Sequence, residues 1–364
     1  MAPQTIALSP RTTVLAGPNG QGKTNFLEAI HLLCTLRPLR AQKLTELVRL
    51  GTSGPARVAG RFELPGGTRE VAVSIVEGRR AATVDGKPVR DPDELFGGLA
   101  VVAFTPDDLA LVKGGPDGRR RLLDRAVQNR HPSHVADARE YLRALKSRNQ
   151  LLRQGAPREL RQSFDGPLAR LGAKLRLRRE QLLDELRVHA VRAFAEVAQG
   201  EAPLQLAYQA AGRDSDGLGD EAALAGEPAL AEKLLSALER RLTTDSERGY
   251  TSVGPHADDL ALAIGDRPAR IFASQGQSRA VVLAFRIGEI ENLRRAQGRA
   301  PLLLLDDVSS ELDPDRNAFL MRYLAGLEGQ VVLTTTDANL VAAAAEDAHF
   351  HAVSEGRIGR VAPP

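Results

Sequence analysis

The residues that decide the fold are Gly17-Pro18-Asn19-Gly20-Gln21-Gly22-Lys23-Thr24, a complete phosphate-binding loop of the form GxxxxGK[ST]. Apolar Val14-Leu15-Ala16 precede the loop and suit the end of a strand, and Asn25 with the five residues after it suits the start of a helix. That context matters because the loop's N–H groups and the helix N-terminus then surround a polyphosphate. The alternative is a glycine-rich turn with a chance lysine. We expect residues 17–25 to bind a nucleotide, with Lys23 on its terminal phosphates and Thr24 on Mg²⁺.

A second strand is expected to complete this site. Pro301-Leu302-Leu303-Leu304-Leu305 is an unbroken apolar run that ends in Asp306-Asp307, which suits a central parallel strand covered on both faces. We expect Asp306 to hold Mg²⁺ opposite Thr24, and Asp307 to orient or deprotonate an attacking water. Asp307 and Lys23 are thus the candidate catalytic residues. The alternative for an Asp-Asp pair alone is a solvated strand end.

The pattern along the 364 residues predicts two kinds of structure. Residues 1–112 carry strand patterns, including a hairpin pattern at Asp85-Gly86 and a short apolar run at 99–104. Residues 119–200 have helical spacing instead, and strand and helix patterns alternate again after residue 250. We therefore expect an α/β fold in which the first and last thirds build one sheet, with a mostly helical lobe between them.

Composition and charge narrow the function. The chain has a single cysteine, Cys34, which excludes a disulfide framework or a cysteine-based metal cluster. Because Cys34 follows apolar residues, we expect it in the core. No apolar run is long enough to span a membrane and no secretory signal precedes the loop, so we expect a cytoplasmic protein without a membrane partner. The net charge is only +3, yet residues 119–192 hold 19 Lys/Arg against 8 Asp/Glu. Segregated charge favours a polyanionic partner such as nucleic acid, with a solvated helical face as the alternative.

Further motifs carry a family resemblance. Ser274-Gln275-Gly276-Gln277 resembles the signature motif of ABC-type ATPases, and Ser309-Ser310-Glu311-Leu312-Asp313 resembles their D-loop, with Asp313 in the characteristic position. SMC-type ATPases insert long coiled coils between the phosphate loop and the signature, whereas this insertion is short. That combination resembles the RecF family of bacterial DNA replication and repair ATPases. Local matches at Thr105-Pro106-Asp107-Asp108-Leu109, at 118–124 and at Gly254-Pro255-His256 extend the resemblance.

The resemblance implies an ABC-type ATPase head that uses ATP and Mg²⁺. It implies residues 1–115 and 246–364 as the ATPase lobe, and residues 116–245 as an inserted basic helical lobe. Ser274 to Gln277 of one copy would face the ATP held by a second copy, so that ATP drives a homodimer. The family acts in DNA replication, recombinational repair and the SOS response, which implies binding to single-stranded, gapped or junction DNA. It further implies recombination mediator proteins as partners, help with recombinase loading, and a weak DNA-dependent ATPase activity.

Several residues depart from the wider ATPase pattern. Most ABC ATPases have Glu at the position of Asp307, whereas the RecF family has Asp there, as this chain does. The shorter side chain of Asp predicts slow hydrolysis. No Gln occupies the glutamine-loop position at residues 105–108, and Ala257 follows His256 where the family usually has Arg. No histidine occupies the switch position, so Thr335 or Thr336 is the candidate sensor of the terminal phosphate.

Basic residues of the inserted lobe are the candidate contacts to DNA phosphates, which bind without reading sequence. They are Arg119, Arg120, Arg121, Lys146, Arg148, Lys174, Arg176, Arg178 and Arg179. Two other functions fit parts of the pattern: the ATPase subunit of an ABC transporter, and a non-hydrolysing DNA clamp that ATP only switches. A GTPase is disfavoured because the chain has no NKxD motif.

Overall fold

The computed structural model describes residues 4–41, 43–49, 51, 54–64, 66–89, 99–212, 226–344 and 348–362. The chain packs as two compact units. The first joins residues 1–108 to residues 289–364, and the second comprises residues 109–288. Residues 246–288, which the resemblance groups with the ATPase, pack in the second unit, so the three-part division by function stays a prediction. The composition of residues 212–229, rich in Gly, Asp and Ala, predicts a loop; most of this range lies outside the described residues, and helix α9 begins within it at Glu227.

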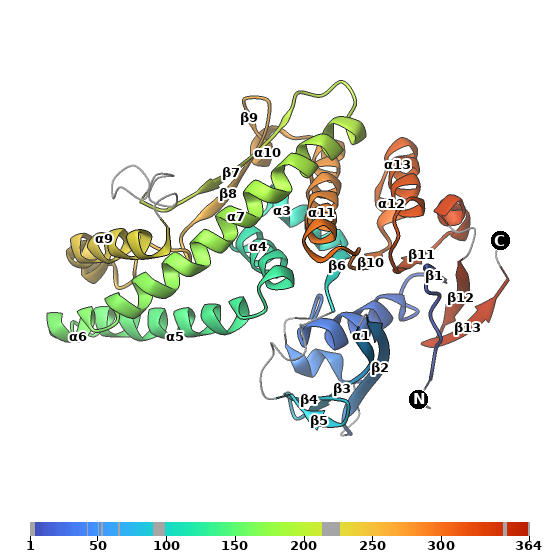
Figure 1. The fold of residues 1–364 in the computed structure, drawn as a ribbon, viewed down its shortest axis with the longest axis horizontal. Helices are drawn as coiled ribbons and strands as arrows, with labels where there is room; N and C mark the ends of the chain where they lie inside the picture. The colour runs from blue at the N-terminus through green and yellow to red at the C-terminus, as the bar shows by residue number, and fades with distance from the viewer. Residues whose placement is uncertain are drawn as a thin grey trace. The chain divides into compact units, whose positions relative to one another are not determined.

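The first unit is built on a six-stranded sheet. Its strand order is β13-β12-β1-β11-β10-β6, with every neighbouring pair parallel except the antiparallel β12–β13 hairpin. The order places the first third of the chain between segments of the last third, which confirms the predicted α/β fold (Figure 1). The strands are β13 (Arg357–Val361), β12 (His349–Ser354), β1 (Thr12–Ala16), β11 (Val331–Thr335), β10 (Leu302–Asp306) and β6 (Val101–Phe104).

Helix α1 (Lys23–Thr35) lies between this sheet and a smaller one. Leu27, Ile30 and Cys34 pack on the six-stranded sheet, while Leu32 and Leu33 pack on the four-stranded sheet β2-β3-β4-β5. A helix covered on both sides needs apolar residues on two faces, as this one has. Burial raises the pKa of the Cys34 thiol to about 12, in keeping with its predicted place in the core. The smaller sheet comprises β2 (Ala56–Leu64), β3 (Gly67–Val76), β4 (Arg79–Val84) and β5 (Lys87–Pro88).

The turn between β4 and β5 has the geometry that its sequence predicts. Asp85 and Gly86 have φ of 50° and 76°, and such positive values at both central positions match the strand twist of a two-residue hairpin. Short helices complete the unit: η1 (Leu44–Leu47), η2 (Pro106–Leu109), α12 (Val308–Glu311), α13 (Pro314–Ala325) and η3 (Ala338–Ala344).

The second unit is mostly helical, as the spacing of residues 119–200 predicts. Its long helices α5 and α7 pack together, with α9 against both. A small antiparallel sheet of β7, β8 and β9 joins them. Its helices are α3 (Ala110–Lys113), α4 (Pro116–Arg130), α5 (His134–Arg153), α6 (Arg158–Gln162), α7 (Asp165–Val197), α9 (Glu227–Arg248), α10 (Ala269–Phe272) and the first part of α11 (Gln275–Gln297). Its strands are β7 (Leu204–Gln209), β8 (Asp259–Ile264) and β9 (Arg267–Pro268).

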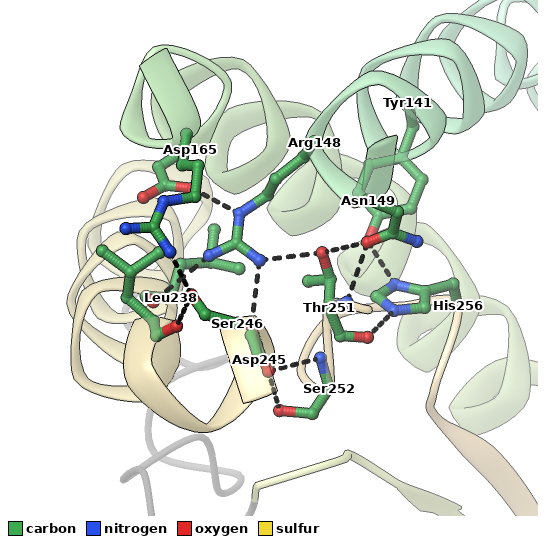
Figure 2. Close-up of polar contacts among 12 residues, drawn as sticks. Tyr141, Arg148, Asn149, Asp165, Leu238, Asp245, Ser246, Thr251, Ser252 and His256 are labelled. Carbon is green, nitrogen blue, oxygen red and sulfur yellow. Dashed lines mark hydrogen bonds and ion pairs between the residues drawn. The ribbon is translucent and has the colours of Figure 1, made fainter. Parts of the chain in front are cut away.

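A fully buried arginine ties three helices and a loop together (Figure 2). Arg148 of α5 donates Nε to Asp165 Oδ1 of α7 at 2.7 Å and Nη1 to Asp245 Oδ2 of α9 at 2.9 Å. The same Nη1 donates to Thr251 Oγ1 at 2.8 Å, which fixes the loop after α9. The negative charges of the two carboxylates compensate for the lost hydration of the guanidinium. Removing any one of these three groups would therefore leave a buried charge without its partner and destabilise the second unit.

The loop after α9 is bonded to α5 at a second point. The Tyr141 hydroxyl lies 2.6 Å from His256 Nδ1, and His256 Nε2 lies 2.9 Å from the Thr251 carbonyl (Figure 2). Burial lowers the pKa of His256, so a neutral ring accepts at Nδ1 and donates at Nε2. His256 of the Gly-Pro-His triplet therefore serves the interior of the second unit.

Removing the buried guanidinium is expected to destabilise the second unit strongly. Arg148→Met leaves Asp165 and Asp245 buried without their cation, so the free energy of unfolding should fall by about 3–5 kcal/mol. Arg143→Met on the exposed face of the same helix should change it by less than about 0.5 kcal/mol. Urea denaturation followed by circular dichroism measures both. Equal stability of the two variants would contradict the structural role of Arg148.

Candidate functional site

The phosphate-binding loop joins β1 to α1 in the strand–loop–helix arrangement that the motif requires. Gly20 and Gly22 have φ of 78° and 100°, values that glycine reaches without strain. Gly17 is required for another reason, since a Cβ at this position would lie 2.3 Å from the Val353 carbonyl oxygen of β12. The loop's backbone is therefore held close to the sheet with its N–H groups at the N-terminus of α1, a geometry that suits an anion.

Lys23 is held inside this loop. Its side chain is almost fully buried, and Nζ donates to the carbonyl oxygens of Gly17 at 2.6 Å and Pro18 at 3.0 Å. The ammonium is thereby fixed next to the backbone that would cradle a phosphate. Gln21 bonds the loop to the turn between β12 and β13. Its side-chain Oε1 accepts from Glu355 N at 2.6 Å, and its carbonyl oxygen accepts from Gly356 N at 3.0 Å. The β12–β13 turn thus supports the loop.

A carboxylate from β10 meets the threonine of the loop. Thr24 Oγ1 lies 2.8 Å from Asp306 Oδ1, and Thr334 Oγ1 of β11 donates to the same oxygen at 3.0 Å. Asp306 is 3% exposed, so this cluster of hydroxyl and carboxylate oxygens is desolvated. Hard oxygen donors suit Mg²⁺, which takes one or two protein ligands and completes its shell with water and phosphate. The described residues contain no group of three or more His, Cys, Asp or Glu that could hold a metal ion.

Asp307 is held in an unusual backbone conformation. Its φ is 50°, in the left-handed region that residues other than glycine rarely adopt, and its N–H donates to Thr334 Oγ1 at 2.9 Å. Its Oδ1 is buried and makes no hydrogen bond to any described residue. Such local strain clusters at functional sites. A carboxylate oxygen kept unbonded beside the Asp306 cluster has the chemistry to orient a water.

Two residues join this cluster without any sequence motif marking them. Thr334 touches both aspartates, whereas Thr335 turns its hydroxyl to the carbonyl of Asp337 at 2.9 Å and Thr336 is exposed. Arg40 places Nη1 at 3.4 Å from Asp306 Oδ2. Arg40 also pairs through Nε with Asp107 at 3.2 Å, at the position where related ATPases carry the glutamine loop.

The residues of the predicted signature lie in the second unit, at the start of α11. Ser274 and Gln277 form a reciprocal cap: Gln277 N donates to Ser274 Oγ at 3.1 Å, and Ser274 N donates to Gln277 Oε1 at 2.8 Å. Ser274 and Gln275 are exposed, while Gly276 and Gln277 are half-buried. The predicted D-loop residue, Asp313, caps α13 in the first unit by accepting from Arg316 N at 3.1 Å.

Burial corrects the assignment of four predicted DNA contacts. Arg119, Arg148, Arg176 and Arg179 are each no more than 5% exposed. Arg119 forms a bidentate pair with Asp259 at 2.7 Å, and Arg179 forms one with Asp124 at 2.7 and 2.9 Å. A guanidinium inside such a pair cannot reach a phosphate outside the protein, so we assign all four a structural role. For Arg148 the helical spacing could have shown this, since it shares a face with buried Tyr141, Leu145 and Leu152.

Charges around Asp124 illustrate how firmly these arginines are held. Burial opposes ionisation of Asp124, but the hydrogen bond to His134 and the Arg179 charge outweigh it and hold the pKa of this carboxyl well below its usual range. The carboxylate is therefore ionised and committed to Arg179 inside the second unit.

The remaining predicted DNA contacts differ in their freedom. Lys174 and Arg178 of α7 both pair with Asp137 of α5, at 2.9 and 2.7 Å, and Arg120 donates to the Asp258 carbonyl at 2.5 Å. Arg121 and Lys146 are exposed. Of the nine, these two are the ones that face solvent without an ion pair to a described residue.

Comparison with known proteins agrees with this geometry. A family model described as the RecF/RecN/SMC N terminal domain matches residues 1–358. The DNA replication and repair protein RecF of Anaeromyxobacter sp. (strain Fw109-5) is 55% identical over 353 residues, which cover 96% of this chain and 93% of that protein. The described helices include none that is long and apolar enough to cross a membrane.

Solved structures extend the comparison to the fold. The recombination mediator protein RecF-ATPrS in the RecFOR pathway matches with a TM-score of 0.87 and 29% identity, over 99% of this chain and 94% of that one. The SmcHead bound to the C-winged helix domain of ScpA matches with a TM-score of 0.54 and 16% identity, over 98% of this chain and 91% of that one. The second likeness concerns the fold alone.

Thr334 rather than Thr336 is expected to matter for Mg²⁺-dependent ATP hydrolysis. Thr334→Val removes the hydroxyl that holds both Asp306 and the Asp307 backbone, so turnover should fall by about tenfold or more, the loss of roughly one charge-assisted hydrogen bond. Thr336→Val alters an exposed neighbour and should change turnover by less than about twofold. Phosphate release at a series of Mg²⁺ concentrations measures both. A larger loss of turnover in Thr336→Val than in Thr334→Val would contradict this expectation and support Thr336 as the switch.

Proposed function

The chain belongs to the RecF family, and we propose that it is an ATP-dependent DNA-binding protein of replication and recombinational repair. The observation that carries the ATP part is the contact between Thr24 and Asp306, 2.8 Å long, beside the buried Lys23. Those groups supply the charge and the oxygen ligands that a Mg²⁺-nucleotide needs. The solved relative described as RecF-ATPrS supports the same ligand. Membership of the RecF family argues against the alternative function, the ATPase subunit of an ABC transporter.

When Mg²⁺ is bound, it would neutralise charge on the nucleotide phosphates, and Thr24 and Asp306 are the residues proposed to hold it. Lys23 would bind the terminal phosphates, and residues 17–25 would cradle them through backbone N–H groups. Asp307 would orient the attacking water through its unbonded Oδ1. The Asp307 side chain is shorter than that of Glu and reaches less far toward a water, so we propose a weak ATPase activity. We further propose that DNA stimulates this activity, as the family resemblance implies. Asp313 remains the proposed D-loop residue, and Thr335 or Thr336 the proposed switch.

The second part of the proposal is a homodimer formed by ATP. Ser274 and Gln275 are exposed at the N-terminus of a helix of 23 residues, where partial positive charge favours an anion. The signature motif packs in a different compact unit from the phosphate loop, and the proposal is that it faces the nucleotide of a second copy. Two shared nucleotides would then give the closed two-fold assembly usual for homodimers.

The third part concerns DNA and partners. We propose binding to single-stranded, gapped or junction DNA in the cytoplasm, in a pathway with recombination mediator proteins that helps to load a recombinase and serves the SOS response. The solved relative, a recombination mediator protein in the RecFOR pathway, supports this. A DNA clamp that binds ATP without hydrolysing it is the competing proposal, and measured phosphate release by the unmodified protein distinguishes the two.

Light scattering tests the nucleotide, the dimer and the DNA together. With ATP the mass should double, while ADP or no nucleotide should leave a monomer, and short DNA should add its own mass to the ATP form. Lys23→Ala removes the ammonium beside the phosphates and should abolish both ATP binding and the mass increase. An unchanged response of this variant to ATP would contradict the phosphate-loop assignment.

Ser274→Arg is expected to separate ATP binding from dimerisation. A bulky cation at the exposed start of α11 would block approach of a second copy, so the mass increase with ATP should disappear. ATP binding to the monomer, measured by equilibrium titration, should change by less than about twofold because the phosphate loop lies in the other unit. Loss of nucleotide binding itself would contradict a site shared between two copies.

A further inference from the structure

One face of α5 carries a row of basic side chains that the fold itself does not use. Arg139, Arg143, Lys146 and Arg153 are exposed, and none of them pairs with another described residue. Successive steps of four, three and seven residues return to the same side of an α-helix, and Gln150 occupies the intervening position. We call these five residues the basic row. Four of its members, at positions 139, 143, 150 and 153, are not among the predicted DNA contacts.

The opposite side of α5 explains why the row points outward. Arg148 and Leu152 are buried there, with Arg148 bonded to α7 and α9. Asp137 turns toward α7, where Lys174 and Arg178 pair with it at 2.9 and 2.7 Å. Asp137 and Arg148 of α5 are thus paired inside the unit, where α5 lies beside α7 (Figure 1). Unpaired positive charge is left on the outer face.

The row is not the mixed surface of an ordinary solvated helix. Helix α9 of the same unit exposes Glu232 and Glu239 as well as Arg248, so its exposed charges are of both signs. The basic row contains no acid. Glu140 is exposed on α5 about 60° around the helix axis from Arg143, and no ion pair joins it to the described residues of the row.

We propose that the basic row binds the phosphodiester backbone of duplex DNA, an inference that rests on the proposed DNA-binding function. At about 1.5 Å per residue the row runs for about 21 Å, and a duplex carries one phosphate charge per about 1.7 Å of its axis, so several phosphates lie within reach of the row. Arginine, lysine and glutamine side chains all donate to phosphate oxygens, and such contacts position a protein without reading sequence.

The chemistry of this face favours a duplex over a single strand. Binding of unpaired bases usually needs aromatic side chains on which the bases stack. Helix α5 is described along its whole length, and its one aromatic residue, Tyr141, is buried, which leaves Leu142 as the large apolar side chain exposed beside the row. A phosphate-only surface therefore suits the outside of a double helix.

The test neutralises two central members of the row in the full chain. Arg143→Gln with Lys146→Gln should weaken binding to a short blunt duplex about tenfold or more near 0.1 M salt. The slope of log affinity against log salt should fall by about 1.8, since each lost duplex phosphate contact contributes about 0.9. Fluorescence anisotropy over a salt series measures both, with a single strand of the same sequence as the second ligand.

A matched control separates a local surface from a change in net charge. Arg248→Gln with Arg267→Gln removes the same two charges from exposed positions of the same unit outside α5, and should leave duplex affinity within about twofold. An equal loss in the control pair would overturn the proposal, and so would a loss confined to the single strand. ATP binding and the circular dichroism spectrum of both pairs check that the fold is intact.

The remaining outcomes distinguish this proposal from the function on which it rests. If the unmodified protein binds duplex and the row variant binds it equally well, the row is overturned while DNA binding stands. If the unmodified protein binds neither DNA ligand even at low salt, the DNA-binding function fails and the row fails with it. An oligo-glutamate peptide that binds the unmodified protein but not the row variant, at unchanged duplex affinity, would identify an acidic protein partner instead.

Discussion

The hydrogen bond between Thr24 Oγ1 and Asp306 Oδ1, 2.8 Å long, is the contact on which the nucleotide site depends. It joins residues 282 positions apart, and it exists because the first strand of the chain enters a sheet built mostly from the last third. In the parallel order β1-β11-β10, Ala16 pairs with Thr335, and Thr334 pairs with Asp306. The carboxyl ends of the three strands therefore meet at one edge, where ligands of open α/β sheets bind.

Local patterns in the sequence predict much of this site, and register explains what they miss. The glycines of the loop, the run of leucines before Asp306 and the cap at Ser274 each involve only near neighbours, so the sequence contains the whole pattern. Thr334, Thr335 and Thr336 are indistinguishable by type. Only the pairing of β11 with β10 decides that Thr334 faces Asp306, because side chains alternate between faces and a slip of one residue exchanges them. Arg40 reaches the site from a loop that no periodicity constrains.

The charges along the sequence predict that the inserted lobe is basic, but they do not predict which basic side chains lie on its surface. Residues 119–192 carry 19 Lys/Arg, yet Arg119, Arg148, Arg176 and Arg179 are buried in ion pairs. The partners of Arg119 and Arg148 include Asp259 and Asp245, which lie about a hundred residues or more away in the chain, so the pairing becomes visible only once the helices are packed. Arginine can be buried in this way because its planar fork satisfies two carboxylate oxygens at once.

The buried and exposed charges of α5 depend on each other. Arg148 is bonded to α7, α9 and the loop at Thr251, and these bonds leave α5 a single rotation about its axis. A rotation by one residue, about 100°, would carry the guanidinium out of its pocket and turn the basic row toward a flank of the helix. Because a buried charge without its partner is destabilising by several kcal/mol, such rotated states are suppressed. The internal ion pairs therefore determine which charges the second unit presents to solvent, and thereby the surface available to a polyanion.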